Sequence, residues 1–291
     1  MIEVESLQFR YPKQGADTLR GISFKIGAGE TFGFLGPSGS GKSTTQKLLT
    51  GLLKNYSGQL QILEKQGRDW NHELYQHIGV GFELPNHFSK LSGLENLNLF
   101  ASFYATDNAA GSKSPMDLLE LVDLAASANQ RVAEYSKGMK MRLNFARALL
   151  NDPEILFLDE PTAGLDPVTA HRLKDIIRDL QKRGKTIFLT THNMYDADEL
   201  CDRVGFIIDG ELKLVGGPAE LKRQHGQRTV RVEIEKAENI ESTNSHEFSL
   251  EGLGNNAEFL GLLNSENVQS IHSQEATLEE VFIKTTGASL I

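Results

Sequence analysis

The chain has 291 residues, of which 39% are hydrophobic and 24% charged, and its formal net charge is −9. This composition supports a folded core and excludes a largely disordered chain. The excess of acidic residues argues against a broad nucleic-acid interface, because contacts with phosphates need clustered cations. We therefore expect no nucleic-acid partner.

Cysteine content and hydropathy indicate the cellular compartment and whether the chain spans a membrane. The single cysteine, Cys201, cannot form an internal disulfide, which favours the reducing cytoplasm. The apolar runs are far shorter than the about 20 residues of a membrane-spanning helix, and the N-terminus lacks the pattern of a signal peptide. We expect a chain that does not cross a membrane by itself.

The first part of the chain predicts β-structure around a glycine-rich loop. Residues 2–9 predict a strand, and residues 21–25 and 31–35 predict the two strands of a hairpin, joined by a turn at 27–30. Residues 44–53 predict a short helix directly after the loop. A loop between a strand and a helix is the context that a phosphate-binding motif requires.

The middle of the chain predicts a helical segment followed by buried strands. Residues 91–150 show apolar positions at roughly helical spacing. Short apolar runs then occur at residues 154–158, 186–190 and 204–208, separated by helix-like segments. Such runs are typical of parallel strands in an α/β sheet. We predict an α/β core with a helical subdomain at about 84–150.

The last part of the chain differs in charge. Residues 223–291 hold eleven Glu and five Lys or Arg, a net charge of −6, which leaves −3 for residues 1–222. We predict a small α+β appendage there, with a solvated acidic surface; a regulatory or dimerisation module is the alternative. Its predicted elements are two pairing strands, a helix and a capping box, at residues 229–234, 248–250, 257–263 and 277–280.

The glycine-rich loop fits the phosphate-binding pattern G-x-x-x-x-G-K-[ST]. Gly39 and Gly41 would let backbone N–H groups curl around a phosphate, at the positive end of the following helix. Lys42 would bridge the β- and γ-phosphates of a nucleotide, and Ser43 would bind Mg²⁺ through its hydroxyl. The residues predicted to contact the nucleotide here are Gly36, Pro37, Ser38, Gly39, Ser40, Gly41, Lys42, Ser43 and Thr44.

Two acidic residues, Asp159 and Glu160, end the apolar run at 154–158. A carboxylate at the carboxyl end of a parallel strand would face the phosphate loop. Asp159 would hold Mg²⁺, and Glu160 would polarise the water that attacks the γ-phosphate. The pair alone fits a surface loop equally well, and the presence of Lys42 favours the catalytic interpretation.

Three further segments resemble motifs of ATP-binding cassette (ABC) transporter ATPases. Tyr135-Ser136-Lys137-Gly138-Met139 is similar to the signature motif, with Ser136 standing 23 residues before Asp159. Residues 161–166 resemble the D-loop, and Thr190-Thr191-His192 resembles the switch-histidine segment. The resemblance covers residues 1 to about 222. It implies a P-loop NTPase core of the ABC ATPase type, with antiparallel β and helical subdomains, and a C-terminal accessory domain at 223–291.

The resemblance also implies roles for single residues. Ser136 and Gly138 would contact the γ-phosphate of ATP bound to a second chain, and Asp166 would lie across that interface. His192 would contact the γ-phosphate in its own chain and belongs with the catalytic residues. Tyr11 matches the aromatic residue that stacks on adenine, and ordinary packing at a strand edge is the alternative.

Two positions depart from the family pattern. Glu83 stands where a Gln is usual, and the signature has Lys137 and Met139 where Gly and Gln are commoner. A carboxylate at position 83 would bind the metal or the water, and it would make the site depend more on Mg²⁺ for charge neutralisation. Both departures resemble those in bacterial exporter ATPases, including antibiotic and multidrug exporters, whose membrane subunits are separate chains.

The family mechanism implies two partners. One copy of each motif implies a homodimer, or a heterodimer with a similar ATPase, that closes around ATP. The second partner is an integral membrane permease, which would place this chain peripherally at the cytoplasmic face of the membrane. The permease is expected to contact residues 83–100, with Pro85, His87 and Phe88 as exposed candidates.

Other interpretations stay open at this point. A soluble ABC-type ATPase switch without a permease is the main alternative, and a P-loop kinase or GTPase is opposed by the signature, the D-loop and the switch histidine. Lys137, Lys140 and Arg142 form a basic cluster that would lie near phosphate or on a solvated helix face. Cys201 and the other histidines lack the spacing of a metal site.

Overall fold

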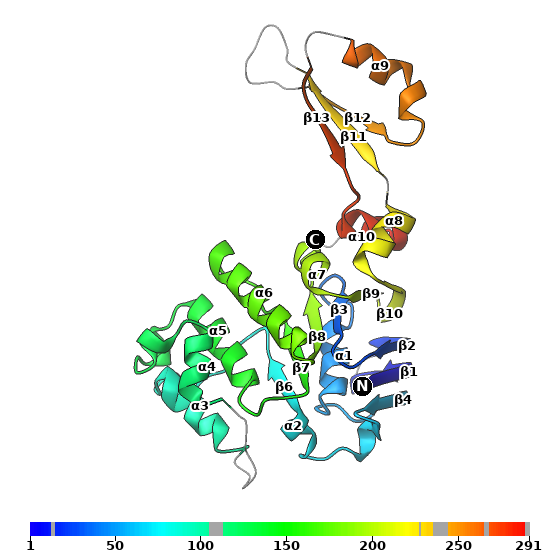
Figure 1. Cartoon of the computed structure of the whole chain (residues 1–291). Coiled ribbons are helices and arrows are strands. Elements are labelled where there is room, and N and C mark those ends of the chain that lie inside the picture. Colours follow the sequence, from blue (N-terminus) through cyan, green and yellow to red (C-terminus); the bar gives the residue numbers. More distant parts are fainter. Residues whose placement is uncertain (13–14, 105–112, 227, 235–243, 265–267, 289–291) are drawn as a thin grey trace. The chain divides into compact units, whose positions relative to one another are not determined.

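The computed structural model describes residues 1–12, 15–104, 113–226, 228–234, 244–264 and 268–288. The chain divides after Gly216 into two compact units (Figure 1). Among the described helices, none is both long enough and apolar enough to cross a membrane.

A six-stranded sheet forms the centre of the first unit, in the order β10-β9-β3-β8-β7-β6. All neighbours are parallel except β9 and β10, which are antiparallel. The predicted parallel strands are therefore confirmed. The strands of this sheet are β3 (Thr31–Leu35), β6 (Ile78–Gly81), β7 (Ile155–Asp159), β8 (Thr186–Thr191), β9 (Arg203–Ile208) and β10 (Glu211–Gly216).

A second sheet, in the order β2-β1-β4-β5, is antiparallel. Its strands are β1 (Ile2–Phe9), β2 (Leu19–Ile26), β4 (Ser57–Ile62) and β5 (Lys65–Gln66). The predicted hairpin of residues 21–25 and 31–35 is wrong, because β2 pairs with β1 while β3 lies between β8 and β9. All five residues of β3 are buried, as a central parallel strand requires, whereas exposure in β2 alternates.

Phenylalanine rings join the two sheets. Phe24 of β2 packs against Phe34 of β3 with ring centroids 5.4 Å apart, and Phe34 lies 5.6 Å from Phe188 of β8. Phe32 and Phe157 complete this cluster. Contacts between offset or tilted aromatic rings add to the free energy gained by burying their apolar area. The cluster therefore fixes the parallel sheet, whose strand ends carry the predicted catalytic residues, against the antiparallel one.

Among the described residues, the first unit has seven α-helices. The helix after the glycine-rich loop begins two residues earlier than predicted and ends at Leu49, before Gly51 with a φ of 73°. Three helices lie in the predicted helical segment (Figure 1), and Ser92, Ser114 and Ser136 cap their N-termini. The helices are α1 (Lys42–Leu49), α2 (Leu74–His77), α3 (Gly93–Ala101), α4 (Pro115–Leu121), α5 (Lys137–Ala148), α6 (Pro167–Lys182) and α7 (Met194–Leu200). Short 3₁₀ helices occur at Gly67–Asp69, Ala125–Ser127 and Val132–Glu134.

Cys201 follows α7 and is buried. A Cβ atom added to Gly33 of β3 would lie 2.7 Å from its Sγ, so the thiol fills the space that this glycine leaves. Burial raises the pKa of the Cys201 thiol, and nearby carboxylates such as that of Asp202 add to the effect. The thiol is a packing group of the core.

The second unit is α+β, as predicted. Strand β11 (Thr229–Ile234) lies between β12 (Asn244–Ser249) and β13 (Val268–Gln274) in an antiparallel sheet. Val230, Val232 and Phe248 form its core with Phe259 of α9. The predicted capping box at Thr277 is present. The helices of the unit are α8 (Pro218–His225), α9 (Ala257–Leu263) and α10 (Leu278–Thr286), with a 3₁₀ helix at Leu253–Asn255.

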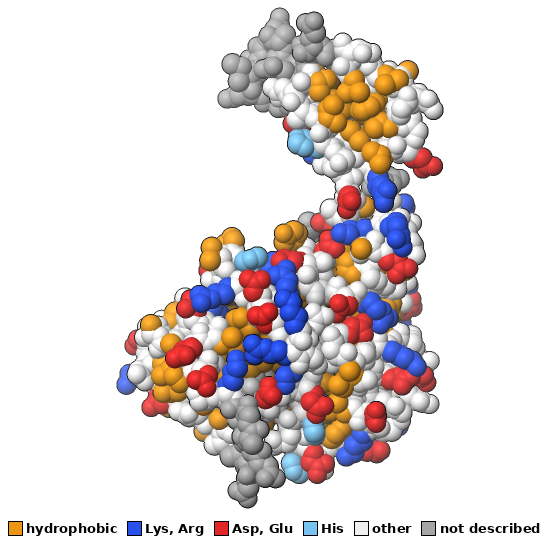
Figure 2. Space-filling model, in the orientation of Figure 1, with side chains coloured by type: hydrophobic (Ala, Val, Ile, Leu, Met, Phe, Trp, Pro, Cys, Tyr) orange, Lys and Arg blue, Asp and Glu red, His pale blue; other side chains and the backbone are white. Residues whose placement is uncertain are grey.

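Hydrophobic side chains gather on the surface over α9 in Figure 2. Leu260 and Leu263 of α9 are exposed large apolar residues, and so is Leu250, which directly follows β12. Phe259, by contrast, turns inward to the sheet and is buried. The acidic part of the sequence therefore also carries an apolar surface, which its charge pattern did not predict.

A substitution at Gly79 of β6 would test how tightly the parallel sheet packs against α5. A Cβ atom at this position would lie 1.9 Å from the carbonyl oxygen of Ala148. We expect Gly79→Ala to lower the free energy of unfolding by about 2–3 kcal/mol, the usual cost of overpacking. Thermal or urea unfolding measures the effect. Gly15→Ala, whose Cβ would meet nothing within 4 Å, should leave stability unchanged; equal stability of the two variants would contradict this packing.

Candidate functional site

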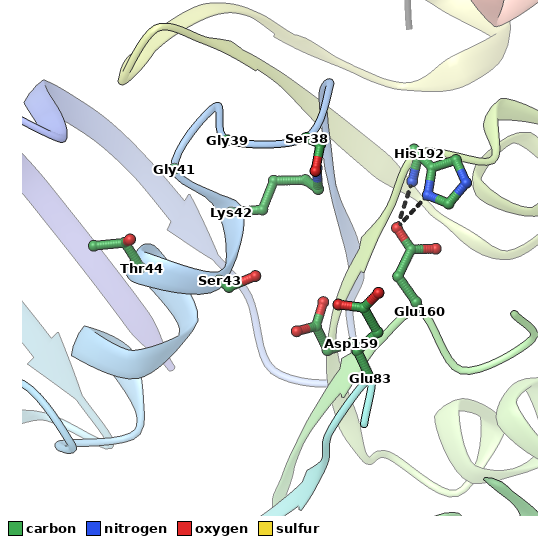
Figure 3. A pocket seen from close by; sticks show the side chains of 10 residues that line it. All are labelled: Ser38, Gly39, Gly41, Lys42, Ser43, Thr44, Glu83, Asp159, Glu160 and His192. Atoms are coloured by element: carbon green, nitrogen blue, oxygen red, sulfur yellow. Dashed lines mark hydrogen bonds and ion pairs between the residues drawn. The ribbon is translucent and has the colours of Figure 1, made fainter. Parts of the chain in front are cut away.

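A pocket of about 410 Å³ lies at the carboxyl ends of the parallel strands (Figure 3). The loop between β3 and α1 forms one wall together with the first turn of α1, and residues at the carboxyl ends of β6, β7 and β8 form the other. Ligands of α/β proteins bind at this edge of the sheet. The pocket is lined by Ser38, Gly39, Gly41, Lys42, Ser43, Thr44, Glu83, Asp159, Glu160 and His192.

The glycine-rich loop depends on the absence of side chains at two positions. A Cβ atom on Gly36 would lie 2.1 Å from the carbonyl oxygen of Ile207. Gly41 has a φ of 115°, and a Cβ atom there would lie 2.7 Å from Leu19 Cδ2. Lys42 Nζ donates hydrogen bonds to the carbonyl oxygens of Gly36 (2.6 Å) and Pro37 (2.9 Å). The loop thus wraps around its own lysine, whose ammonium group lies in the pocket.

One ammonium group faces three carboxylates in this pocket. Burial lowers the pKa of Lys42, and the negative charges of Glu160, Asp159 and Glu83 oppose that shift. Burial also raises the pKa of Asp159, and the charges of Glu83 and Glu160 raise it further, against a hydrogen bond from Thr190 and the charge of Lys42. A cation in the pocket would relieve this excess of negative charge.

The oxygen atoms that would hold such a cation lie together. In Figure 3, the carboxylates of Asp159 and Glu83 lie close to each other and face the side of the pocket where Ser43 places its hydroxyl. Carboxylate and hydroxyl oxygens are hard donors of the kind that Mg²⁺ prefers. The residues present therefore fit a magnesium ion.

Glu160 is held by the loop that follows β8. Its Oε1 accepts hydrogen bonds from the backbone N–H of His192 (2.9 Å) and from His192 Nδ1 (2.6 Å), and its Oε2 accepts one from Thr191 Oγ1 (2.9 Å). Glu160 is only 6% exposed, and its φ is 48°, in the left-handed region that non-glycine residues rarely adopt. The surrounding hydrogen bonds thus fix both the backbone and the carboxylate of Glu160.

The signature and D-loop residues do not line this pocket. Ser136 caps α5 and accepts a hydrogen bond from the N–H of Met139 (3.2 Å). Asp166 caps α6, and hydrogen bonds from Thr169 and Val168 lower the pKa of its carboxyl. Gly138 lies beside Leu165, the residue before Asp166. The described part of one chain therefore does not bring Ser136, Gly138 and Asp166 into the pocket with the glycine-rich loop.

Tyr11 lies at the edge of the site. Its hydroxyl is 3.2 Å from Thr44 Oγ1, and its ring packs edge to face against Phe9 at 4.9 Å between centroids. Tyr11, Gly36, Pro37 and Ser40 are not among the residues that line the pocket. Stacking of Tyr11 on adenine stays a prediction.

The basic cluster of α5 is not a single phosphate-facing group. Arg142 Nη1 donates to the carbonyl oxygens of Val122 (2.9 Å) and Asp123 (2.8 Å), so it ties α5 to the end of α4. Lys137 lies against the D-loop, since a Cβ atom on Gly164 would be 2.8 Å from its Nζ. These contacts join segments that lie far apart in the sequence. The spacing of the basic residues along α5 could not predict them.

The expectation that Pro85 and His87 are exposed is wrong. Both are half-buried, whereas Phe88 is 52% exposed. His87 Nε2 donates a hydrogen bond to the carbonyl oxygen of Lys140 (3.0 Å), which fastens the segment after Glu83 to the signature helix. Burial lowers the pKa of His87 to about 4, with smaller contributions from the charges of Arg147 and Lys140, against the hydrogen bond.

A second, larger groove of about 640 Å³ adjoins the pocket and shares Ser43, Glu83 and Asp159 with it. Aromatic and apolar side chains line this groove beside Arg147, a residue that no sequence motif marks. Arg147 donates to the carbonyl oxygen of Asn86 (2.8 Å) and lies over the ring of Phe100. The other apolar and aromatic residues that line this groove are Tyr75, Ile78, Val80, Phe82, Leu84, Tyr104 and Ala148.

Comparisons with known proteins identify the family. A family model described as ABC transporter matches residues 19–163. The fluoroquinolones export ATP-binding protein of Mycobacterium tuberculosis (strain CDC 1551 / Oshkosh) is 52% identical over all of this chain and 94% of its own length. The chain belongs to the ATP-binding subunits of ABC transporters. The linearmycin resistance ATP-binding protein of Bacillus subtilis (strain 168) is 30% identical over all of this chain and 99% of its own.

Solved structures agree with this assignment. The ATP-binding cassette MJ0796, described as a dimer in a post-hydrolysis state with bound ADP and Pi, superposes with a TM-score of 0.68 and 28% identity. The similarity covers 75% of this chain and 98% of that chain. The predicted ABC ATPase fold and the ATPase activity are thus confirmed. A second family model, described as fluoroquinolone efflux ABC transporter C-terminal domain, matches residues 228–275 of this ABC ATPase.

The low pKa of His87 makes stability depend on pH. In the unfolded chain a histidine binds a proton below about pH 6.5, whereas the folded chain resists protonation until about pH 4. Stability should therefore fall as pH drops through this window. Between pH 7 and 5, His87→Gln, which keeps a donor but does not titrate, should lose about 2 kcal/mol less than wild type. Denaturant unfolding at several pH values tests this; exposed His72→Gln is the control, and identical slopes for wild type and His87→Gln would contradict it.

Proposed function

We propose that this ATPase binds Mg²⁺ with ATP, that two such subunits close head to tail around two nucleotides, and that the closure drives a separate membrane permease of an export system. The strongest support is that the predicted nucleotide contacts fall into two groups, one inside the pocket and one outside it. Lys42, Glu160 and His192 line the pocket, whereas Ser136 and Asp166 lie outside it. A second chain would supply what the pocket of one chain lacks.

In the proposed site, Lys42 binds the β- and γ-phosphates together with the N–H groups of the glycine-rich loop. Ser43, Asp159 and Glu83 would hold Mg²⁺, which would supply charge neutralisation when bound. Glu160 accepts a proton from the attacking water, and His192 holds both the carboxylate and the γ-phosphate. The pair of hydrogen bonds from His192 to Glu160 Oε1 supports this assignment.

The partner in closure is proposed to be a second copy of this chain, or a similar ATPase. Gly138 and Ser136 would cap the nucleotide held by the partner's glycine-rich loop. Support comes from MJ0796, which is described as a dimer. Within one chain, Lys137 and Gly164 already join the signature helix to the D-loop, so both motifs would approach the partner as one surface.

Export and the permease are proposed from the relatives. Besides the fluoroquinolones export protein, Nod factor export ATP-binding protein I of Burkholderia lata is 40% identical over 70% of this chain and 67% of its own length. The chain would act peripherally at the cytoplasmic face of the membrane, and the permease would select the cargo. The comparisons lend no support to the alternative of a soluble switch without a permease. We also propose that residues 1–222 form the ATPase domain and that 223–291 form an accessory domain, a boundary that falls within α8, six residues after the division between the two compact units.

The groove beside Glu83 is the proposed docking surface for the permease. Leu84 and Phe82 are exposed apolar residues on its wall, and Arg147 lies among its aromatic rings. The groove meets the nucleotide pocket at Glu83 and Asp159. A permease segment seated there would therefore contact a loop that also holds the metal, which offers a direct route between hydrolysis and transport.

Glu160→Gln tests the composite site. The amide cannot accept a proton, so ATP turnover should fall at least about a hundredfold, whereas ATP binding should persist and Mg-ATP should convert the monomer to a stable dimer. Turnover assays and mass measurement by light scattering give both results. Glu154→Gln, an exposed position at the other end of β7, is the matched control and should behave as wild type. Full turnover by Glu160→Gln, or a variant that binds ATP and stays monomeric, would count against the proposal.

Glu83→Gln tests the charge argument. Because it removes one of three carboxylates from the pocket, it should tighten ATP binding in EDTA several-fold and should change Mg-ATP binding less. Titration calorimetry with and without Mg²⁺ measures both dissociation constants. Glu73→Gln, exposed and outside the pocket, is the control. An unchanged ratio of the two constants in Glu83→Gln would show that the charge at position 83 does not bear on nucleotide binding.

A further inference from the structure

The carboxylate of Asp196 is buried and contacts both the loop after β7 and the loop after β8, which adjoin the pocket. Asp196 of α7 is 6% exposed. Its Oδ2 accepts hydrogen bonds from Thr162 Oγ1 (2.6 Å), in the D-loop segment, and from Asn193 Nδ2 (3.1 Å), the residue after the switch histidine. One carboxylate oxygen is therefore shared by the loop that follows β7 and the loop that follows β8.

Positive charge supports Asp196 from α6. Lys174, also 6% exposed, places its Nζ 3.2 Å from Asp196 Oδ1 and pairs as well with Glu199, which in turn pairs with Arg178. Burial disfavours the charged form of Lys174, but its bonds to Glu199 and Asp196 outweigh this and raise its pKa. Buried ion pairs contribute little net stability, because desolvation offsets their attraction. Stability alone therefore does not account for this network of ion pairs. Its role would be to fix the two loops through Asp196.

The hydrogen bonds close a ring that starts and ends next to the catalytic glutamate. Thr191 Oγ1 donates to Glu160 Oε2 and accepts from the N–H of Asn193 (2.9 Å each). Asn193 then donates to Asp196, and Asp196 accepts from Thr162, which is two residues from Glu160 along the chain. Each member has a defined donor or acceptor role, so a shift of one loop strains the bonds to the other.

We propose that Asp196 is a positioning residue that couples the switch-histidine loop to the D-loop through its shared hydrogen bonds to Asn193 and Thr162. A movement of His192 toward or away from the γ-phosphate is then passed to the D-loop, and with it to Asp166 at the proposed interface with the second chain. The inference rests on the proposed roles of Glu160 and His192. It adds a connection between the two halves of the composite site within one chain.

Thr162 offers a matched pair of variants. Thr162→Val keeps the shape of the side chain and loses the donor, while Thr162→Ser keeps the hydroxyl. Loss of a hydrogen bond to a charged group is expected to lower kcat about tenfold in Thr162→Val, with KM for ATP within about twofold and an unchanged melting temperature. Thr162→Ser should recover most of the wild-type kcat.

Asp196→Asn and the double variant test the coupling itself. If Thr162 acts through Asp196, adding Thr162→Val to Asp196→Asn should lower kcat no further. Independent, multiplicative losses in the double variant would overturn the inference. So would a Thr162→Val enzyme with wild-type kcat, or one whose melting temperature and KM change together with kcat, as a purely structural bond would predict.

His192→Ala separates this inference from the function on which it rests. An inactive His192→Ala beside a fully active Thr162→Val would remove the coupling and leave the proposed roles of the pocket residues intact. A fully active His192→Ala would overturn both. An inactive His192→Ala together with a Thr162→Val enzyme that loses kcat alone would support the coupling.

Discussion

The carboxylate of Glu160 is the point on which the site depends. It accepts three hydrogen bonds from Thr191 and His192, and in return it holds the loop after β8 against the end of β7. These bonds offset the strain of a backbone in the left-handed region. A group so restrained reacts from one orientation only. Replacing it would free the loop as well as remove the proposed base, so one residue would govern both the geometry and the proposed chemistry of the pocket.

Charge imbalance governs the rest of the pocket. Lys42 is turned toward the carbonyl oxygens of its own loop, and three carboxylates stand opposite. Such a pocket suits an anion that arrives with its own cation. Glu83 strengthens this requirement, because it adds a third carboxylate to those of Asp159 and Glu160. The same residue borders the apolar groove, so the charge state of the nucleotide site and the surface proposed for the permease meet at a single side chain.

Features that belong to a sequence motif were predictable from the sequence, whereas contacts between segments far apart in the chain were not. The glycine-rich loop, Asp159 and Glu160 follow from local patterns whose function fixes their spacing, and the all-buried β3 shows why its apolar run should have indicated a central strand rather than half of a hairpin. The burial of His87 depends on α5, over fifty residues away. Asp196 looks like an ordinary surface acid on a short helix, and only the fold brings Thr162 and Lys174 to it.

The packing of Cys201 against Gly33 has a practical consequence. The chain holds one thiol, which is buried and whose pKa is raised. Reagents that react with thiolates should therefore not modify it. A cysteine introduced at an exposed position would then be labelled selectively without altering the native residue. Spectroscopic distances between such labels would test the proposed opening and closing of two subunits during turnover.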